Sequence, residues 1–177
     1  LDVLGETSFA GPSTNDDGTL AGAAAALTAS GAVTGALNVD LNGAPRRAAA
    51  LAGVVFVKPT YGTVSRYGVI PCACSGEQVG VTAKNAAAAA EFLAVVAGHD
   101  DKDGTSLPEK RYAYQIGDSV RGMRFGIPKE FLEKADPDIS ERVLAFGRAM
   151  AGSGASVGEF SFAEVSLAQP AWHILMS

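Results

Sequence analysis

Short apolar blocks alternate with polar, glycine-containing segments along this chain. Long blocks rich in Ala and Leu favour helices, and short blocks rich in Val and Phe favour buried strands. Helices are predicted over residues 20–30, 45–53, 84–97 and 138–151, with another beginning at 164; strands are predicted over 32–39, 54–57, 123–127 and 155–160; loops are predicted over 11–19, 60–80 and 100–106. Because helices alternate with short strands, the pattern predicts an α/β layered fold.

Three local signals sharpen these boundaries. Asn42 and Gly43 favour a turn, and Pro45 suits the first position of the helix that follows. Asn85 is a good N-cap for the alanine-rich helix after it. The helix over 138–151 is amphipathic, with apolar residues at helical spacing on one face; they are Ile139, Val143, Phe146 and Met150.

The composition is that of a folded protein and excludes some function classes. The chain has 177 residues, of which 47% are hydrophobic and 19% charged. Residues 1–177 are therefore expected to form a single domain, and the motifs described below indicate that this domain is incomplete. The formal net charge is -5 without a dense run of Lys and Arg, so the sequence gives no signal for direct nucleic-acid binding. No apolar run is long enough to span a membrane.

Metal and cofactor chemistry is not predicted. Cys72 and Cys74 are one residue apart, too close for an unstrained disulfide, and no His cluster accompanies them as in a zinc site. His99 is interpreted as a local hydrogen-bonding residue. His173 is not expected to belong to a Ser-His-Asp triad, because the sequence has no Gly-x-Ser-x-Gly motif. The acidic positions within 100–103 lack the spacing of a Ca²⁺ loop, and a solvated loop is expected there.

A long motif connects the chain to a known family. Residues 53–68 read GVVFVKPTYGTVSRYG, and this run resembles the amidase signature family, in particular the branch of glutamyl-tRNA(Gln) amidotransferase A subunits. Residues 75–80, 97–106 and 120–131 are similar to further motifs of that family in the same order. The resemblance runs through nearly the whole chain but covers only a middle portion of a usual member.

That resemblance implies a mixed central sheet with helices on both faces. It also implies the family's Ser-Ser-Lys triad, in which a serine nucleophile opens a helix after a glycine-rich turn. A second serine in a cis peptide passes a proton between the nucleophile and a lysine, and backbone N–H groups of the turn form the oxyanion hole.

The nucleophile is missing where the motif predicts it. Residues 40–46 read DLNGAPR and align with the family's nucleophile motif, in which Asp40, Gly43 and Arg46 agree. The nucleophile position is then Ala44, whose methyl group has no lone pair with which to attack a carbonyl.

The second serine is missing as well. Its position falls on Leu20, or on Ala21 if the alignment moves by one residue, and the neighbouring Thr19 is not expected to replace it. The family's catalytic lysine lies upstream of the matched segment. Lys58 belongs with Pro59 to the Lys-Pro-Thr motif and is not that lysine.

Two further positions depart from the family. Asn42 stands where the oxyanion turn has a glycine, which restricts the backbone although Asn tolerates a left-handed conformation. Glu77 stands where the family has an aspartate. With the two missing serines, these changes predict that the chain is not an enzyme.

The sequence therefore favours a catalytically inactive amidase-like protein that is a structural or docking subunit of a larger complex, with other protein subunits as partners. Kinship with the family suggests a mitochondrial or other organellar matrix. The alternative is a part of a split amidase or glutamine amidotransferase whose remaining catalytic residues come from another chain. A small-molecule binding module that uses the inactive pocket is a third hypothesis.

Overall fold

The computed structural model describes residues 19–73, 75–109, 114, 117 and 119–176. The chain divides into two compact units, Leu1–Ile116 and Gly117–Ser177, and each is described by itself. The single domain expected over 1–177 stays a prediction. The predicted loop over 11–19 lies outside the described residues except for Thr19, which begins the first helix.

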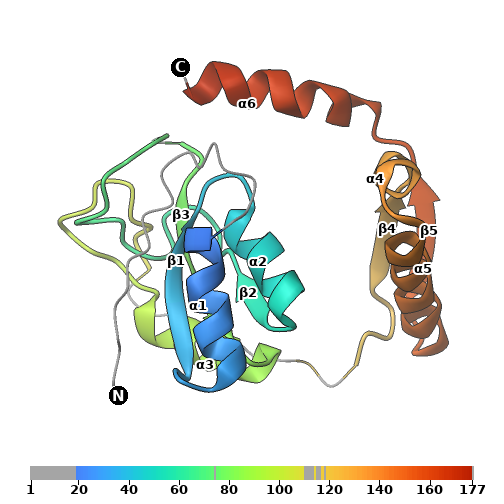
Figure 1. Cartoon of the computed structure of the whole chain (residues 1–177), viewed down its shortest axis with the longest axis horizontal. Helices are drawn as coiled ribbons and strands as arrows, with labels where there is room; N and C mark the ends of the chain where they lie inside the picture. The colour runs from blue at the N-terminus through green and yellow to red at the C-terminus, as the bar shows by residue number, and fades with distance from the viewer. Residues whose placement is uncertain (1–18, 74, 110–113, 115–116, 118, 177) are drawn as a thin grey trace. The chain divides into compact units, whose positions relative to one another are not determined.

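The first unit contains a three-stranded antiparallel sheet and three helices (Figure 1). The sheet has the order β1-β3-β2, so β3 is the central strand. The elements are α1 Thr19–Ser30, β1 Gly35–Asp40, α2 Ala44–Ala52, β2 Val55–Val57, β3 Gln78–Ala83 and α3 Ala86–Val96. Each predicted helix and strand of this unit is present within a few residues of its expected limits, and Asn85 caps α3 by accepting from the N–H of Ala88.

Helices cover both faces of this sheet, which confirms the predicted α/β arrangement. On one face, Val79 and Val81 of β3 pack with Ala89 and Leu93 of α3. The helices α1 and α2 pack through a separate small cluster centred on Ala25 and Ala48, and both also contact the sheet. Small side chains let these two helices approach closely.

The prediction of a loop throughout 60–80 is wrong at its end, because β3 begins at Gln78. All six residues of β3 are buried, since the strand has a partner on each side and helices on both faces. Gly80 is required there: a Cβ at this position would lie 2.5 Å from the Val57 carbonyl oxygen. Polar side chains such as Gln78 are tolerated in this interior because they are hydrogen-bonded.

The second unit is built around two parallel strands, β4 and β5, joined by a helical crossover. Its elements are β4 Arg124–Pro128, α4 Lys129–Lys134, α5 Pro137–Gly152, β5 Ser156–Phe160, a 3-10 turn Ala163–Leu167 and α6 Ala168–Met176. The short helix α4 was not predicted from the sequence. The side of α5 that contacts the strands includes Gly147, which lies against Ile127 and Val157. Within the described part of the chain, no helix is long and apolar enough to cross a membrane.

Candidate functional site

The predicted nucleophile turn is organised by one buried carboxylate at the end of β1. Asp40 is completely buried, and its Oδ1 accepts from the backbone N–H of Gly43 at 3.0 Å. Arg46 donates to the same carboxylate through Nε at 2.8 Å and Nη2 at 3.1 Å, a bidentate arrangement. We call this set of contacts, together with the contact from Lys58, the Asp40 clamp.

Lys58 completes the clamp from β2's far end. Its Nζ lies 3.3 Å from Asp40 Oδ1 and donates to the carbonyl oxygen of Gly76 at 3.0 Å. Burial by itself raises the pKa of Asp40, but the hydrogen bond from Arg46 and the charges of Lys58 and Arg46 outweigh it and hold that pKa below its ordinary value. The carboxylate is therefore charged at neutral pH and fixes the turn, β2 and the segment before β3 to one another.

The turn enters α2 through a glycine in a left-handed conformation and without a side-chain cap. Gly43 precedes α2 with a φ of 99°, in the left-handed region, and a Cβ there would lie 3.2 Å from the Arg46 guanidinium. Asn42 does not take up that conformation, since no described residue other than glycine has a positive φ. The helix α2 begins at Ala44, so Pro45 is its second residue, one position later than predicted.

Ala44 is thus placed where the family's nucleophile is expected, but it presents a methyl group. This side chain packs beside the Ala25 and Ala48 cluster between α1 and α2. Thr19, Leu20 and Ala21 form the beginning of α1, and their side chains lie outside the described part of the structure. The described residues therefore bring together the retained motif positions, and they place no hydroxyl at position 44.

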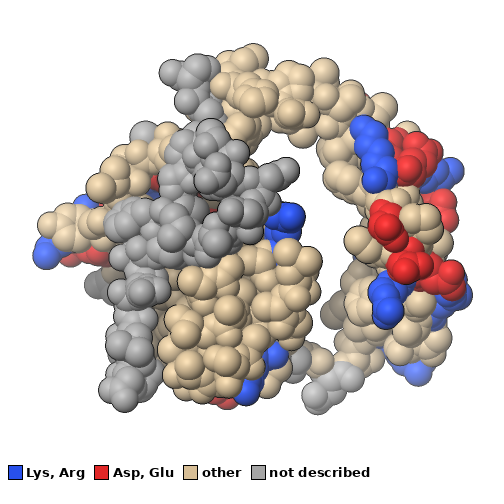
Figure 2. All heavy atoms as spheres, viewed as in Figure 1, with Lys and Arg blue, Asp and Glu red and all other residues tan. Residues whose placement is uncertain are grey.

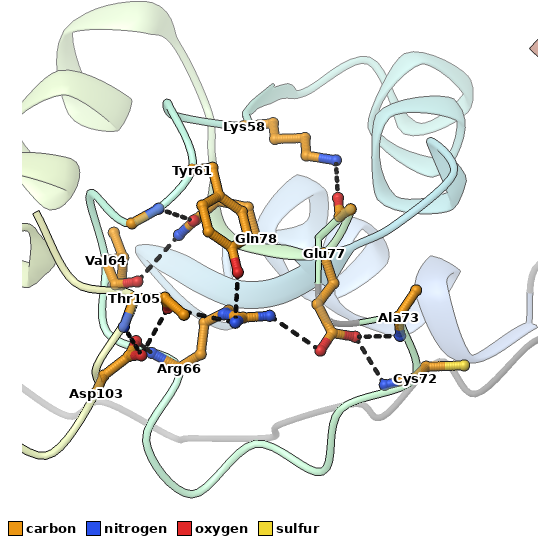
Figure 3. A network of polar contacts seen from close by, with 12 residues as sticks. Lys58, Tyr61, Val64, Arg66, Cys72, Ala73, Glu77, Gln78, Asp103 and Thr105 are labelled. Carbon is orange, nitrogen blue, oxygen red and sulfur yellow. Dashed lines mark hydrogen bonds and ion pairs between the residues drawn. The ribbon is translucent and has the colours of Figure 1, made fainter. Parts of the chain in front are cut away.

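A second polar network is centred on Arg66, and Figure 3 shows it together with Lys58 of the clamp. Arg66 Nη1 lies 3.2 Å from the carboxylate of Glu77, and Nη2 donates to the Tyr61 hydroxyl at 2.7 Å. Glu77 also accepts from the backbone N–H of Cys72 at 3.0 Å. Only 2% of the Glu77 side chain is exposed, so it is a buried ion-pair partner. Glu77 thus places a carboxylate, paired with Arg66, where the sequence comparison expects an aspartate.

Sequence reasoning did not identify Arg66 as the centre of this network. Its backbone N–H donates to Asp103 at 2.7 Å, which joins the loop after β2 to the loop after α3. Burial raises the pKa of Asp103, but hydrogen bonds from Thr105 and from the Arg66 backbone outweigh it and lower that pKa overall. The only available signal was the position of Arg66 inside the matched motif of 53–68.

Gln78 and His99 also hold loops. Gln78 accepts from the N–H of Gly62 at 2.7 Å and donates to the carbonyl oxygen of Val64 at 3.1 Å (Figure 3). His99 Nδ1 lies 3.0 Å from the carbonyl oxygen of Leu107, which confirms its interpretation as a local hydrogen-bonding residue. Within the described residues, no group of three or more potential metal-binding side chains is present.

A shallow pocket of about 260 Å³ opens beside this network. Its lining includes Arg66, Tyr67, Glu77, Lys102 and Asp103. Charges of both signs line it, and Lys102 Nζ lies 5.1 Å from the centre of the Tyr67 ring. Arg66, Glu77 and Asp103 contact one another or neighbouring groups and so brace the loops, although the buried Nε of Arg66 has no hydrogen-bond partner among the described residues.

The comparisons with known proteins agree with this geometry. The Amidase family profile matches residues 12–177, which is most of the chain. The chain therefore belongs to the amidase family, as its motifs predicted.

Among curated proteins, the chain is similar to several A subunits of glutamyl-tRNA(Gln) amidotransferases. It is 39% identical to that of Methanosarcina barkeri over 96% of this chain and 38% of the relative. It is 38% identical to that of Lacticaseibacillus casei over 88% of this chain and 33% of the relative. The chain spans only about a third of the length of these relatives.

A solved structure shows the same relation. The corresponding amidotransferase protein of Thermotoga maritima superposes with a TM-score of 0.80 at 31% identity, covering 86% of this chain and 34% of that one. The expected resemblance to this branch of the family is confirmed, and so is the fold class.

Proposed function

We propose that this chain is one part of a larger amidase or glutamine amidotransferase whose remaining catalytic residues come from another chain. The observation that carries the proposal is the intact Asp40 clamp at the start of α2, in a chain that matches about a third of its amidotransferase relatives. A buried charge held by three donor residues keeps the turn in shape. An ordered turn is what a site needs if its other catalytic residues come from a partner chain.

In this proposal the chain contributes shape and binding rather than the nucleophile. Covalent amide hydrolysis needs an activated hydroxyl, thiol or amine, and Ala44 offers none. The turn can still present backbone N–H groups to a developing negative charge. We therefore expect no amide hydrolysis from the chain alone, and hydrolysis of glutamine or a related amide from the complete assembly.

A second candidate is an inactive structural or docking subunit, and the alanine at position 44 favours it. In that case the clamp serves only to keep the fold. Both candidates require other protein subunits, and family kinship makes a mitochondrial or other organellar matrix the proposed location for either of them.

One experiment separates the two. The tagged full chain is recovered from its own cells by gentle lysis and size separation, co-migrating proteins are identified by mass spectrometry, and each fraction is assayed for ammonia released from glutamine. Hydrolysis in the complex, reduced by Asp40→Asn and unchanged by Asp101→Asn, supports the split enzyme. A defined complex without hydrolysis supports the docking role. A chain that migrates alone near 18 kDa contradicts both.

A further inference from the structure

The shallow pocket beside the Arg66 network contains two carboxylates, and both have donors of their own. Glu77 faces the Arg66 guanidinium and accepts from the backbone N–H of Cys72 (Figure 3). Asp103 accepts from the Arg66 backbone N–H and from the N–H and hydroxyl of Thr105. The acids of the pocket therefore have little acceptor capacity left with which to hold a cationic ligand.

Two donors of the same lining have no acceptor within the described part of the chain. The ammonium of Lys102 makes no ion pair or hydrogen bond there and lies over the Tyr67 ring, 5.1 Å from its centre. Its charge helps to lower the pKa of Asp100, but the hydrogen bond from Ser65 is the larger cause. The second donor is the buried Nε–H of Arg66. A pocket whose unpaired groups are donors is suited to a ligand that supplies acceptors.

The remaining lining is partly apolar. Val69 and Pro71 line the pocket together with Tyr67, of which 64% is exposed. Apolar walls with a few polar groups are the usual composition of a small-molecule site, and a volume of about 260 Å³ limits the ligand to a small molecule. Neither Asp40 nor Ala44 lines this pocket, so it is not the predicted nucleophile turn.

We propose that this pocket binds a small organic carboxylate. The carboxylate accepts from the Lys102 ammonium beside the Arg66 guanidinium, and the apolar part of the ligand lies against Val69 and Pro71. Hydrogen bonds between charged partners are stronger than neutral ones, which favours an ionised ligand. Inorganic phosphate offers the same acceptors but makes no use of the apolar wall. The inference does not depend on the proposed function, because neither the nucleophile turn nor a partner chain takes part.

The test is a titration of the full chain with benzoate, followed through the NMR signals of the backbone amides. Benzyl alcohol has the same ring without the charge, and inorganic phosphate has the charge without the ring. We expect benzoate to shift the amide signals of 66–69 and 102–104 in a saturable way. Benzyl alcohol and phosphate should each bind at least about fivefold more weakly than benzoate.

Matched variants assign the binding to the pocket. Lys102→Gln removes the unpaired ammonium and should weaken benzoate binding about fivefold. Lys84→Gln removes the same charge from an exposed lysine outside the pocket and should leave binding within about twofold. Tyr67→Ala should weaken benzoate binding without changing the response to phosphate. Because Lys102 and Tyr67 are exposed, these variants are expected to fold, and circular dichroism checks that they do.

Saturable benzoate binding that depends on Lys102 and Tyr67 but not on Lys84 supports the inference. Phosphate that binds as tightly as benzoate, irrespective of Tyr67, identifies a site for a bare oxyanion and overturns it. Shifts that rise linearly with benzoate or spread over the whole chain overturn it as well, and so does an equal loss of binding with Lys84→Gln. Each of these outcomes leaves the proposed split enzyme to its own test.

Discussion

Replacing Asp40 by Asn tests whether the clamp holds the first unit together. The substitution preserves the size of the side chain but removes the charge that Arg46 and Lys58 face. It also puts an NH₂ group among donors, so that at most one oxygen can still accept. The first unit should become less stable, and the turn before α2 should lose its fixed geometry.

The expected magnitude follows from the burial of the partners. Breaking a fully buried ion pair costs about 3–5 kcal/mol, because the remaining charge is left without a partner. Here the carboxylate is completely buried, but 54% of the Arg46 side chain and 25% of the Lys58 side chain are exposed. Water can therefore stabilise part of the orphaned charge. We expect a loss of about 2–3 kcal/mol in the free energy of unfolding.

The assay must follow the first unit, and the single tryptophan, Trp172, lies in the second. Hydrogen exchange of the β1 and β3 amides reports the first unit directly, and chemical denaturation followed by circular dichroism reports the unfolding of the whole chain. Asp101→Asn is the matched control, since 99% of that side chain is exposed, and it should leave stability unchanged.

The pH dependence provides the refuting result. Because the folded-state pKa of Asp40 lies below its ordinary value of 3.8, its contribution is fully present above that ordinary value. It is lost as the pH falls through the lower folded-state pKa. The stability difference between the native chain and Asp40→Asn should therefore shrink in strong acid. Equal effects of Asp40→Asn and Asp101→Asn at neutral pH, or a difference that persists unchanged into strong acid, would refute the reasoning.

Three further substitutions test the interior of the first unit by chemical denaturation and hydrogen exchange. Glu77→Gln should cost about 2–3 kcal/mol because it leaves a buried guanidinium without its anion, and a loss below about 0.5 kcal/mol would contradict that role. Gly80→Ala should destabilise by at least about 2 kcal/mol through the clash with the β2 backbone, whereas Gly22→Ala, in open space on α1, should be neutral or stabilising; equal effects would contradict the packing. Asn85→Ala should cost about 1 kcal/mol and speed exchange at the start of α3, and unchanged exchange there would argue against the cap.

The sequence predicted those elements whose signals are local. The turn at 42–43 with Pro45 defined the start of α2, and Asn85 defined the start of α3. By contrast, β3 was hidden because its strand pattern is broken by Gly80 and by buried polar residues. The residues that make such a strand possible are partners from elsewhere in the chain, and a single sequence does not show the pairing.

The same reasoning explains which parts of the site were predicted. The motif placed Asp40, Gly43 and Arg46 together, and the structure confirms that they form one cluster. It could not show that Lys58 bridges that cluster to Gly76, since this contact spans 18 residues of chain. It also treated Glu77 only as a departure from the family, although the longer side chain still reaches Arg66. An apolar face, likewise, predicts burial against something, but it does not say which surface covers α5.

The clamp and the nucleophile position are physically independent, and this independence is what makes a partner-dependent function reasonable. The clamp contacts that hold the turn involve Asp40, Arg46, Lys58 and a backbone N–H, and none of these contacts requires a hydroxyl at position 44. A methyl group there is compatible with α2 and packs with the alanines between the helices. The clamp is therefore expected to hold the turn in the first unit whether or not position 44 carries a hydroxyl, which is what the proposed split enzyme requires.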